Sequence, residues 1–346
     1  MKPAAFLAAC VACSYFGTAS AATILVRSTD AAGEGFNDPT PRAPEGGNPG
    51  TTLGAQRLFL FNAVAQQWGA LLKSNLVIRI DGSFDPLTPC SASGGVLGQA
   101  GPTSFITLVP TPSGAQPNTF YPMALAEALA NTNENGTDAE IEANFNSSID
   151  TGCLGAGTRF YYGVNPQAAT PANTVRLYPT LLHELGHGLG FVSLVCTTNP
   201  TCQSGWVYGG YPNSLRDVWS FFQANATNTG LLWKDKTNAQ RIADFTADPN
   251  LVWLGANVTA DEAVFQPTAA GETGGHMRLY APATFEPGSS IAHFSKAASN
   301  PDLLMEPVLT NTLVNPVDLT YSLLKDVGWK TFPRDEIFPD GFDAHN

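Results

Sequence analysis

The stretch HELGHGLGF, residues 183–191, is the most informative part of this sequence. On a helix, His183 and His187 lie on one face, one turn from each other. Two imidazoles in that arrangement can bind one zinc ion, and Glu184 can act as a base for a metal-activated water. The preceding residues are largely apolar, and Pro179 is tolerated only in a first helical turn, so we expect a buried helix beginning near it. The alternative, a core helix whose histidines only form hydrogen bonds, is disfavoured by the specificity of the motif.

The composition sets limits on fold and partners. The chain has 346 residues, of which 43% are hydrophobic and 13% charged, with a net charge of -12. This length is enough for one large domain or two lobes with a hydrophobic core. The acidic balance argues against nucleic acid and anionic membrane surfaces as partners, because both require a basic patch.

Residues 1–22 have the pattern of a signal peptide. Lys2 supplies the positive charge, an apolar stretch follows, and small residues at 19–21 form a cleavage site, so we expect cleavage after Ala21 or Ala22. A lipid attachment site at Cys10 is an alternative, but its apolar stretch would be very short. No later segment is apolar enough for a transmembrane helix. We therefore expect a secreted protein, extracellular or periplasmic.

Four of the six cysteines lie outside the leader, and an even number in an exported chain favours two disulfides. Cys196 and Cys202 flank a predicted turn and are expected to pair with each other. Cys90 and Cys153 then pair by elimination. A cysteine-based metal site is the alternative, but these residues lack C-x-x-C spacing.

Hydrophobic periodicity predicts a mixed set of elements. A long amphipathic helix is expected at 53–73 and a last helix at 319–327, ended by Gly328. Shorter helices are expected at 215–223 and 238–244. Strands are expected at 23–28, 76–80, 105–109, 141–145, 159–162 and 251–254, and residues 83–122 are rich in turns. We divide the chain into a leader at 1–22, an N-terminal lobe at 23–191, a C-terminal lobe at 192–334 and a tail at 335–346.

A catalytic zinc ion normally has three protein ligands, so a third must follow the helix. A nearby glutamate is disfavoured, because none occurs between Glu184 and Glu262. The longer pattern H-E-x-x-H-x-x-G-x-x-H places a third ligand at Ser193, whose hydroxyl is a poor zinc ligand. Asp217 remains a possible ligand on chemical grounds.

Three histidines remain: His276, His293 and His345. His345 is most simply a tail residue, and for His276 an ordinary structural role is favoured. His293 lies twelve residues before Met305.

Four separated elements resemble leishmanolysin-type metzincins, a family of zinc endopeptidases. They are residues 183–191, His293, the sequence LLMEP at 303–307 and the sequence DVGW at 326–329. In that family, H-E-x-x-H-x-x-G-F is followed by a large insertion, a displaced third histidine, a methionine turn and a helix ending in D-x-G-aromatic. The resemblance covers about residues 179–329. Further upstream it extends only to the order of helices and strands.

The resemblance implies that His183, His187 and His293 bind Zn²⁺ and that Glu184 is the general base. It also implies that Met305 packs beneath the metal. Ser193 is then explained, because an insertion of about a hundred residues, longer than ordinary loops, carries the third ligand away. A tyrosine assists in related sites, but the sequence does not choose among Tyr321, Tyr161 and Tyr162.

The expected fold class is α+β, a two-lobed metzincin-like zinc metalloprotease. We expect a twisted, mostly parallel sheet with helices, a loop-rich C-terminal lobe, and an extended protein or peptide substrate beside an edge strand. The expected function is a secreted zinc endopeptidase. The alternative is an extracellular binding or adhesion protein on an inactive scaffold. The presence of Glu184 favours the enzyme, because a structural zinc site does not need a base beside it.

Overall fold

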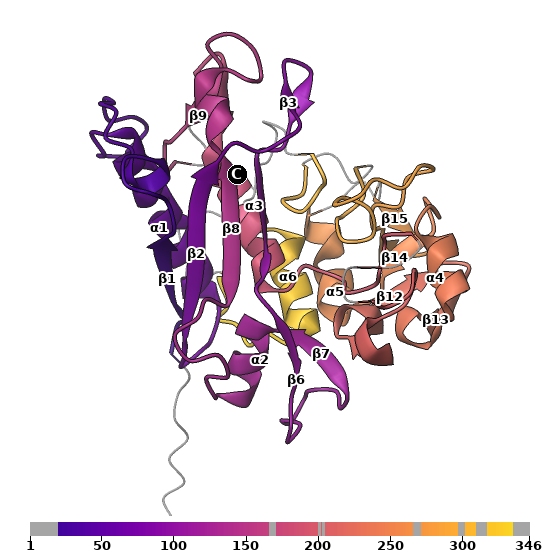
Figure 1. Ribbon diagram of the computed structural model, residues 1–346. Helices are drawn as coiled ribbons and strands as arrows, with labels where there is room; N and C mark the ends of the chain where they lie inside the picture. The colour runs from indigo at the N-terminus through magenta and orange to yellow at the C-terminus, as the bar shows by residue number, and fades with distance from the viewer. Residues whose placement is uncertain are drawn as a thin grey trace, which may run out of the picture.

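The protein has a mixed α and β fold, seen in a computed structural model that describes residues 20–165, 171–199, 202, 205–265, 271–296, 302–308 and 317–334. These residues form six α-helices and several small sheets. The largest sheet has four strands in the order β1 (Thr23–Ser28), β2 (Val77–Asp85), β8 (Ile141–Asn146) and β5 (Gly98–Pro102) (Figure 1).

The four-stranded sheet is parallel except at one edge. β1 pairs with β2, and β2 with β8, in parallel, whereas β5 runs antiparallel to β8. Along β8 the side chains of Ile141, Ala143 and Phe145 are buried, while Glu142 is exposed. This period of two shows that helices cover one face of the sheet and that the other face is open.

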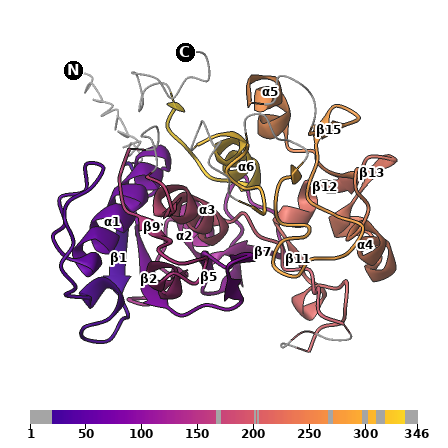
Figure 2. The same cartoon turned by 90° about the horizontal axis from the view of Figure 1, so that it is seen from above.

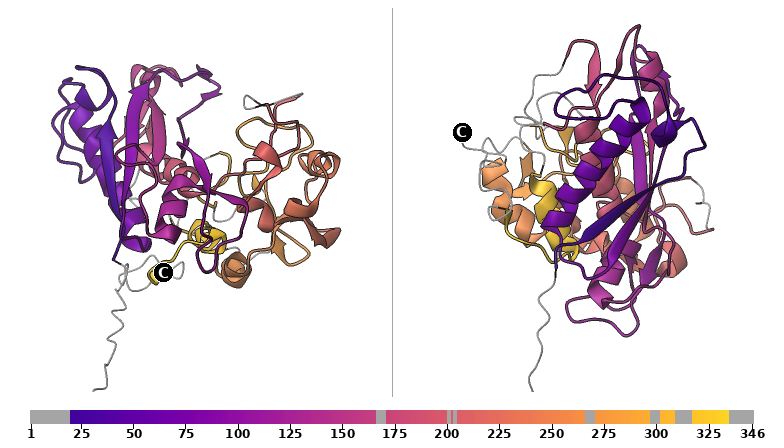
Figure 3. Two further views of the ribbon diagram at one scale, coloured as in Figure 1. Left: turned by 60° about the horizontal axis from the view of Figure 1, so that its bottom comes forward. Right: turned by 90° about the vertical axis from the view of Figure 1, so that its left-hand side faces the viewer.

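Two helices cover the buried face of the sheet. α1 (Leu53–Leu71) crosses it from end to end (Figure 3), and Thr52 caps its first turn by accepting a hydrogen bond from the Ala55 amide. α3 (Leu177–Leu189) lies beside α1 and packs on β5 and β8. The indole of Trp68 in α1 donates a hydrogen bond to the carbonyl of Leu182 in α3 (3.2 Å). This bond joins α1 to α3, which lies between α1 and the antiparallel edge strand β5.

The other described elements are short. In the N-terminal half they are β3 (Cys90–Ser91), β4 (Gly94–Gly95), β6 (Phe105–Thr107), β7 (Thr119–Pro122), α2 (Met123–Ala130), β9 (Arg159–Tyr161) and β10 (Thr174–Arg176). After α3 come β11 (Arg216–Asp217), β12 (Gln223–Asn225), β13 (Asn228–Leu232), α4 (Asn238–Asp244), β14 (Leu251–Trp253), α5 (Ala256–Phe265), β15 (Glu272–Thr273), β16 (His276–Met277) and α6 (Leu319–Val327).

The C-terminal half lies on the far side of α3 and α6 from the four-stranded sheet (Figure 2). Its largest sheet has β12 in the centre, antiparallel to both β13 and β14. Asp326 at the end of α6 accepts hydrogen bonds from the amides of Asn257 and Val258 and from the indole of Trp253. The carboxylate thus caps the start of α5 and joins α6 to the C-terminal half.

Most expected elements are present. The helices at 238–244 and 319–327 have the predicted bounds, and Gly328 ends the latter. The helix at 215–223 was predicted wrongly, because these residues form β11, a 3₁₀ turn and the start of β12. Asp217 explains the difference, since its carboxylate accepts the amide protons of Leu194 and Ser220 and competes with helical hydrogen bonding. The sequence also gave no indication of α2, α5 or β5.

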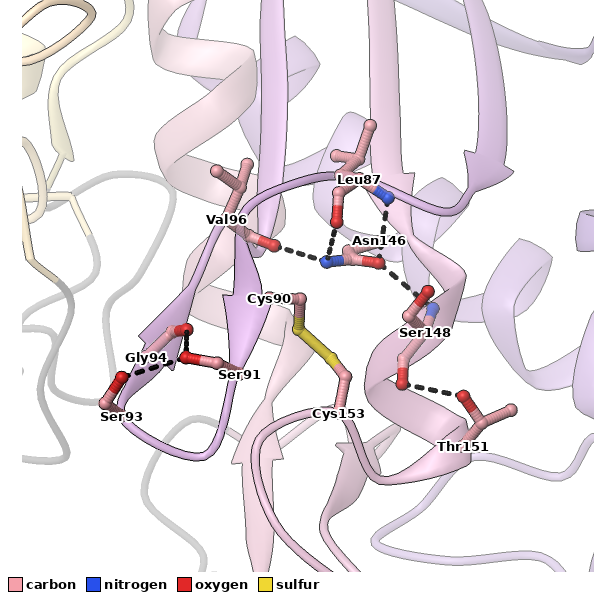
Figure 4. Close-up of a disulfide and its surroundings, with 10 residues drawn as sticks. All are labelled: Leu87, Cys90, Ser91, Ser93, Gly94, Val96, Asn146, Ser148, Thr151 and Cys153. Atoms are coloured by element: carbon pink, nitrogen blue, oxygen red, sulfur yellow. Dashed lines mark hydrogen bonds between the residues drawn. A yellow bond between two sulfur atoms is a disulfide. The ribbon is translucent and has the colours of Figure 1, made fainter.

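Both predicted disulfides are present, Cys196–Cys202 and Cys90–Cys153. The second joins the β3–β4 hairpin to the segment after β8 (Figure 4). Beside it, the Asn146 side chain donates to the carbonyls of Leu87 and Val96 and accepts from the Leu87 amide. Covalent and hydrogen bonds together therefore fasten the chain that leads into β5.

The described residues contain no helix long and apolar enough to span a membrane. Most of the expected leader, and the tail at 335–346, lie outside the described residues. The lobe boundaries stay a prediction.

Candidate metal centre

His293 lies against two histidines of α3, although it comes 106 positions after His187 in the sequence. The Nε2 atoms of His183 and His187 are 3.2 Å apart, and they lie 3.2 and 3.1 Å from Nε2 of His293. His183 and His187 come from successive turns of α3, and His293 from the segment after β16. Among the described residues this is the one group of three or more potential ligand side chains close enough to hold a metal ion.

Each imidazole is oriented by a backbone carbonyl. Nδ1 of His183 lies 2.7 Å from the oxygen of Leu304, and Nδ1 of His187 lies 2.7 Å from that of Phe191. Nδ1 of His293 lies 2.8 Å from the oxygen of Ser289. A carbonyl can only accept, so each Nδ1 carries the proton and each Nε2 presents a lone pair to the shared centre.

The spacing of the Nε2 atoms matches tetrahedral metal coordination. Ligand nitrogens 2.0–2.1 Å from a tetrahedral ion are about 3.3 Å apart, close to the 3.1–3.2 Å observed. Three lone pairs at this distance repel one another, and a cation between them removes the repulsion. The cluster can therefore bind a metal ion.

Burial keeps the three imidazoles neutral. It lowers the pKa of His183 to about 3, with a further contribution from His187, and it lowers the pKa of His187 to about 4. The pKa of His293 is lowered well below its ordinary value by burial and by the two neighbouring histidines. At neutral pH all three are unprotonated at Nε2, which is the form that binds metals.

The backbone close to His293 is in a strained conformation. Ile291, two residues earlier, has φ of +70°, which is rare for a β-branched residue and costs about 1–3 kcal/mol. Two hydrogen bonds hold this conformation: the Ile291 amide donates to Tyr280 (2.7 Å), and the Gln223 side chain donates to the Ile291 carbonyl (2.8 Å).

Met305 packs directly under the helix turn that carries the histidines. It is fully buried, and its sulfur lies 2.9 Å from where a Cβ would be at Gly186. Its carbonyl accepts a hydrogen bond from the amide of Phe294 (2.8 Å). The turn at 302–307 thus contacts α3 and also the residue next to His293.

Glu184 points from α3 toward the edge strand β5. It is 8% exposed, and its carboxylate accepts a hydrogen bond from the Ala100 amide. A Cβ at Gly98 would lie 3.2 Å from Cγ of Glu184, so the absence of a side chain there makes the approach possible. Burial raises the pKa of Glu184 to about 8, and the Ala100 hydrogen bond opposes this rise. Glu184 is therefore held against the edge strand, on the same helix as two of the three histidines.

The other candidate ligands lie outside the cluster. Asp217 holds the loop after α3, accepting from the Leu194 amide (2.6 Å) and the Ser193 hydroxyl (3.2 Å). His276 lies in β16 and is not part of the cluster, and His345 lies outside the described residues.

Two of the candidate tyrosines have their hydroxyl groups engaged elsewhere. That of Tyr321 donates to the carbonyl of Phe332 (2.6 Å), and that of Tyr162 donates to Asp150. The third candidate, Tyr161, lies in β9 and has its hydroxyl against Gly46.

An open hollow of about 270 Å³ lies on the strands beside the site. It is lined by residues 99–102 of β5 and by Glu142 and Asn144 of β8. None of the three histidines lines it.

The sequence did not reveal three contacts that shape the site: the Leu304 carbonyl, the Ala100 amide and the gap at Gly98. Two are backbone groups and the third is a missing side chain, so residue type does not mark them. A glycine-rich stretch at 94–101 was the only available signal.

Comparisons with known proteins give no further guidance, because no family model, no curated protein and no solved structure matches this chain.

Proposed function

We propose that this protein is a secreted zinc-dependent endopeptidase. The observation that carries the proposal is the convergence of three Nε2 atoms within 3.2 Å of one another, two of them from α3, the helix that also carries Glu184. A purely structural zinc site is normally closed by four protein ligands, whereas three protein ligands leave a position open for chemistry. The two disulfides are compatible with export.

Zinc is the metal that best suits the donors. Three neutral imidazoles are typical zinc ligands, and each Nδ1 is hydrogen-bonded to a carbonyl, as is usual for metal-binding histidines. When bound, zinc supplies Lewis acidity that polarises the scissile carbonyl and makes water more acidic.

Glu184 provides the base. Its carboxylate accepts the proton of the attacking water and afterwards delivers it to the nitrogen of the leaving amine. The Ala100 amide holds the carboxylate in place during both transfers. The water attacks directly, so no covalent intermediate with the protein forms.

The edge of β5 provides a place for the substrate backbone. β5 pairs with β8 on one side, and no described strand pairs with its other side. An extended peptide can add to such an edge through main-chain hydrogen bonds. Gly98 has no side chain and Ala100 has only a methyl group, so a substrate can approach the strand closely.

The proposal is tested by cleavage of an unfolded protein by the zinc-loaded chain, beside Glu184→Gln. We expect cleavage by the wild type, loss of cleavage with a zinc chelator, and recovery when zinc is restored. Glu184→Gln should keep stoichiometric zinc and lose cleavage. No cleavage by a folded, zinc-loaded wild type would contradict the proposal and favour an extracellular binding protein on this scaffold.

A further inference from the structure

Leu304, in the turn at 302–307, is held at both of its backbone groups. Its carbonyl accepts the Nδ1 proton of His183 (2.7 Å), and its amide donates to Oδ2 of Asp318 (2.5 Å). Asp318 immediately precedes α6, fourteen positions further along the chain. Leu304 therefore links the buried carboxylate of Asp318 to the imidazole of His183 in the candidate metal centre.

Asp318 is buried at a high energetic cost. It is 1% exposed, and among the described residues no cationic side chain reaches its carboxylate within salt-bridge distance. Burial raises its pKa, and hydrogen bonds from Thr320 and Leu304, together with the charge of Arg334, oppose the rise. Burying a carboxylate without a salt bridge is costly, and within the described part of the chain the hydrogen bonds from Leu304 and Thr320 stabilise it in this position.

Helix capping accounts for only one of its two oxygens. Oδ1 accepts the amide (2.9 Å) and the hydroxyl (2.8 Å) of Thr320, which is an ordinary N-cap for α6. Oδ2 is directed away from the helix to the Leu304 amide. A serine or asparagine would also cap the helix, but only a group with two acceptor oxygens can serve both.

We propose that Asp318 is a positioning residue for the metal ligand His183. By fixing Leu304, it fixes the carbonyl that accepts the hydrogen bond from Nδ1–H of His183, and this bond directs the Nε2 lone pair toward the metal. The inference rests on the proposed metal site and deepens it. Groups behind metal-binding histidines typically change metal affinity 10- to 100-fold when removed.

The structure provides a matched pair of variants. Asp318→Ser keeps a good N-cap for Thr320, but its single short hydroxyl cannot also reach Leu304. Thr320→Val removes a hydrogen bond to the same carboxylate and keeps the link from Asp318 to Leu304. Valine also keeps the methyl group that Thr320 places near Gly186. Asp318→Ser breaks the link to Leu304 and Thr320→Val keeps it, so the pair isolates the effect of this link on His183.

The test measures metal binding without reference to catalysis. Zinc affinity is measured by competition with a chromophoric chelator, and ligand geometry from the d–d absorption of the Co²⁺-loaded protein. We expect Asp318→Ser to bind zinc about 10- to 100-fold more weakly and to show altered Co²⁺ bands. Thr320→Val should show the affinity and spectrum of the wild type.

Each other outcome overturns the inference. If Asp318→Ser keeps the wild-type affinity and spectrum, the hydrogen bond from Leu304 to Asp318 does not position His183, and any fall in the melting temperature of the metal-free protein assigns that bond a purely structural role. If Asp318→Ser does not fold, Asp318→Asn is measured in its place, and failure of both to fold assigns the residue a purely structural role. A wild type that binds neither zinc nor Co²⁺ overturns the proposed function as well, so the two failures are distinguishable.

Discussion

The sulfur of Met305 lies 2.9 Å from the position that a Cβ would occupy at Gly186, between the two histidines of α3. We expect Gly186→Ala to destabilise the protein by about 1–3 kcal/mol, because the added methyl overpacks a fully buried contact. In a Met305→Ala background the same change should become stabilising by up to about 1 kcal/mol, since alanine is the better helix former. Chemical denaturation of the four proteins in this cycle measures the coupling. Equal effects of Gly186→Ala in both backgrounds would show that contact with Met305 does not cause the loss of stability.

Zinc content distinguishes the third ligand from the other histidine in the described C-terminal half. His293→Ala should lose stoichiometric zinc, because two imidazoles on one helix leave the site open on one side. His276→Ala should keep it, since His276 lies in β16 outside the cluster. Native mass spectrometry after dialysis provides the measurement. Equal zinc content in the two variants would remove His293 from the ligand set.

Glu306, next to Met305, should make stability depend on pH. It is 4% exposed, and burial raises its pKa to about 8, with smaller contributions from Asp302 and Asp318. Because the pKa of Glu306 is higher in the folded than in the unfolded protein, its protonated form stabilises the folded state. This stabilisation is fully present below about pH 4.5 and is lost as the pH rises to about 8. Glu306→Gln should therefore gain stability over the wild type across this range, by at most about 1.4 kcal/mol per pH unit.

Urea denaturation of both proteins between pH 5 and 9, with chelator present, checks this dependence on Glu306. Glutamine keeps an acceptor for the Leu303 amide that Glu306 now binds, so the comparison isolates the charge. A difference in unfolding free energy that is constant with pH would show that Glu306 titrates normally.

The helix that carries His183 and His187 could be predicted because its sequence signals are periodic and lie close together in the chain. The spacing of His183 and His187, the apolar residues before them and Gly190, with φ of +128°, define α3 and its end. That His293 lies beside His183 and His187 was predicted only by eliminating other candidate ligands and from the family resemblance. Nothing local in the sequence reveals that Ile291 adopts a left-handed conformation.

The rest of the site depends on backbone groups that have no residue signature. The Leu304 carbonyl and the Ala100 amide act through their positions in space, and any residue could supply them. The strand β5 has five residues, two of them glycines, so it shows no hydrophobic alternation. The segment at 215–223 has apolar residues at helical spacing, but Asp217 takes backbone amides that a helix would need.

The two disulfides should contribute unequally to stability. Cys90–Cys153 closes a loop with a sequence separation of 63, and Cys196–Cys202 one with a separation of 6. Chain entropy then predicts about 4 kcal/mol for the first and about 2 kcal/mol for the second. Replacing each pair by alanines and measuring unfolding by denaturant tests the ranking. A larger loss for the short loop would show that native contacts, and not loop closure, dominate.

Two glycines of β5 offer the most direct test that the strand positions the base. A methyl group at Gly98 would lie 2.8 Å from the ring of Phe145 and 3.2 Å from Cγ of Glu184, whereas at Gly101 it would meet nothing within 4 Å. We expect Gly98→Ala to lower kcat/KM about 10- to 100-fold, since small displacements of a catalytic group have effects of this size. Gly101→Ala should retain wild-type activity, and both variants should bind zinc stoichiometrically.

The comparison of Gly98→Ala with Gly101→Ala is controlled for backbone effects, because both substitutions add the same methyl group to the same strand. Loss of helix or sheet content would appear in circular dichroism, and loss of metal in the zinc assay, so a fall in kcat with both unchanged reports on Glu184. If Gly98→Ala instead raises KM alone, the strand acts on the substrate backbone and not on the base. If the two variants have equal kcat/KM, Glu184 does not depend on its contact with β5.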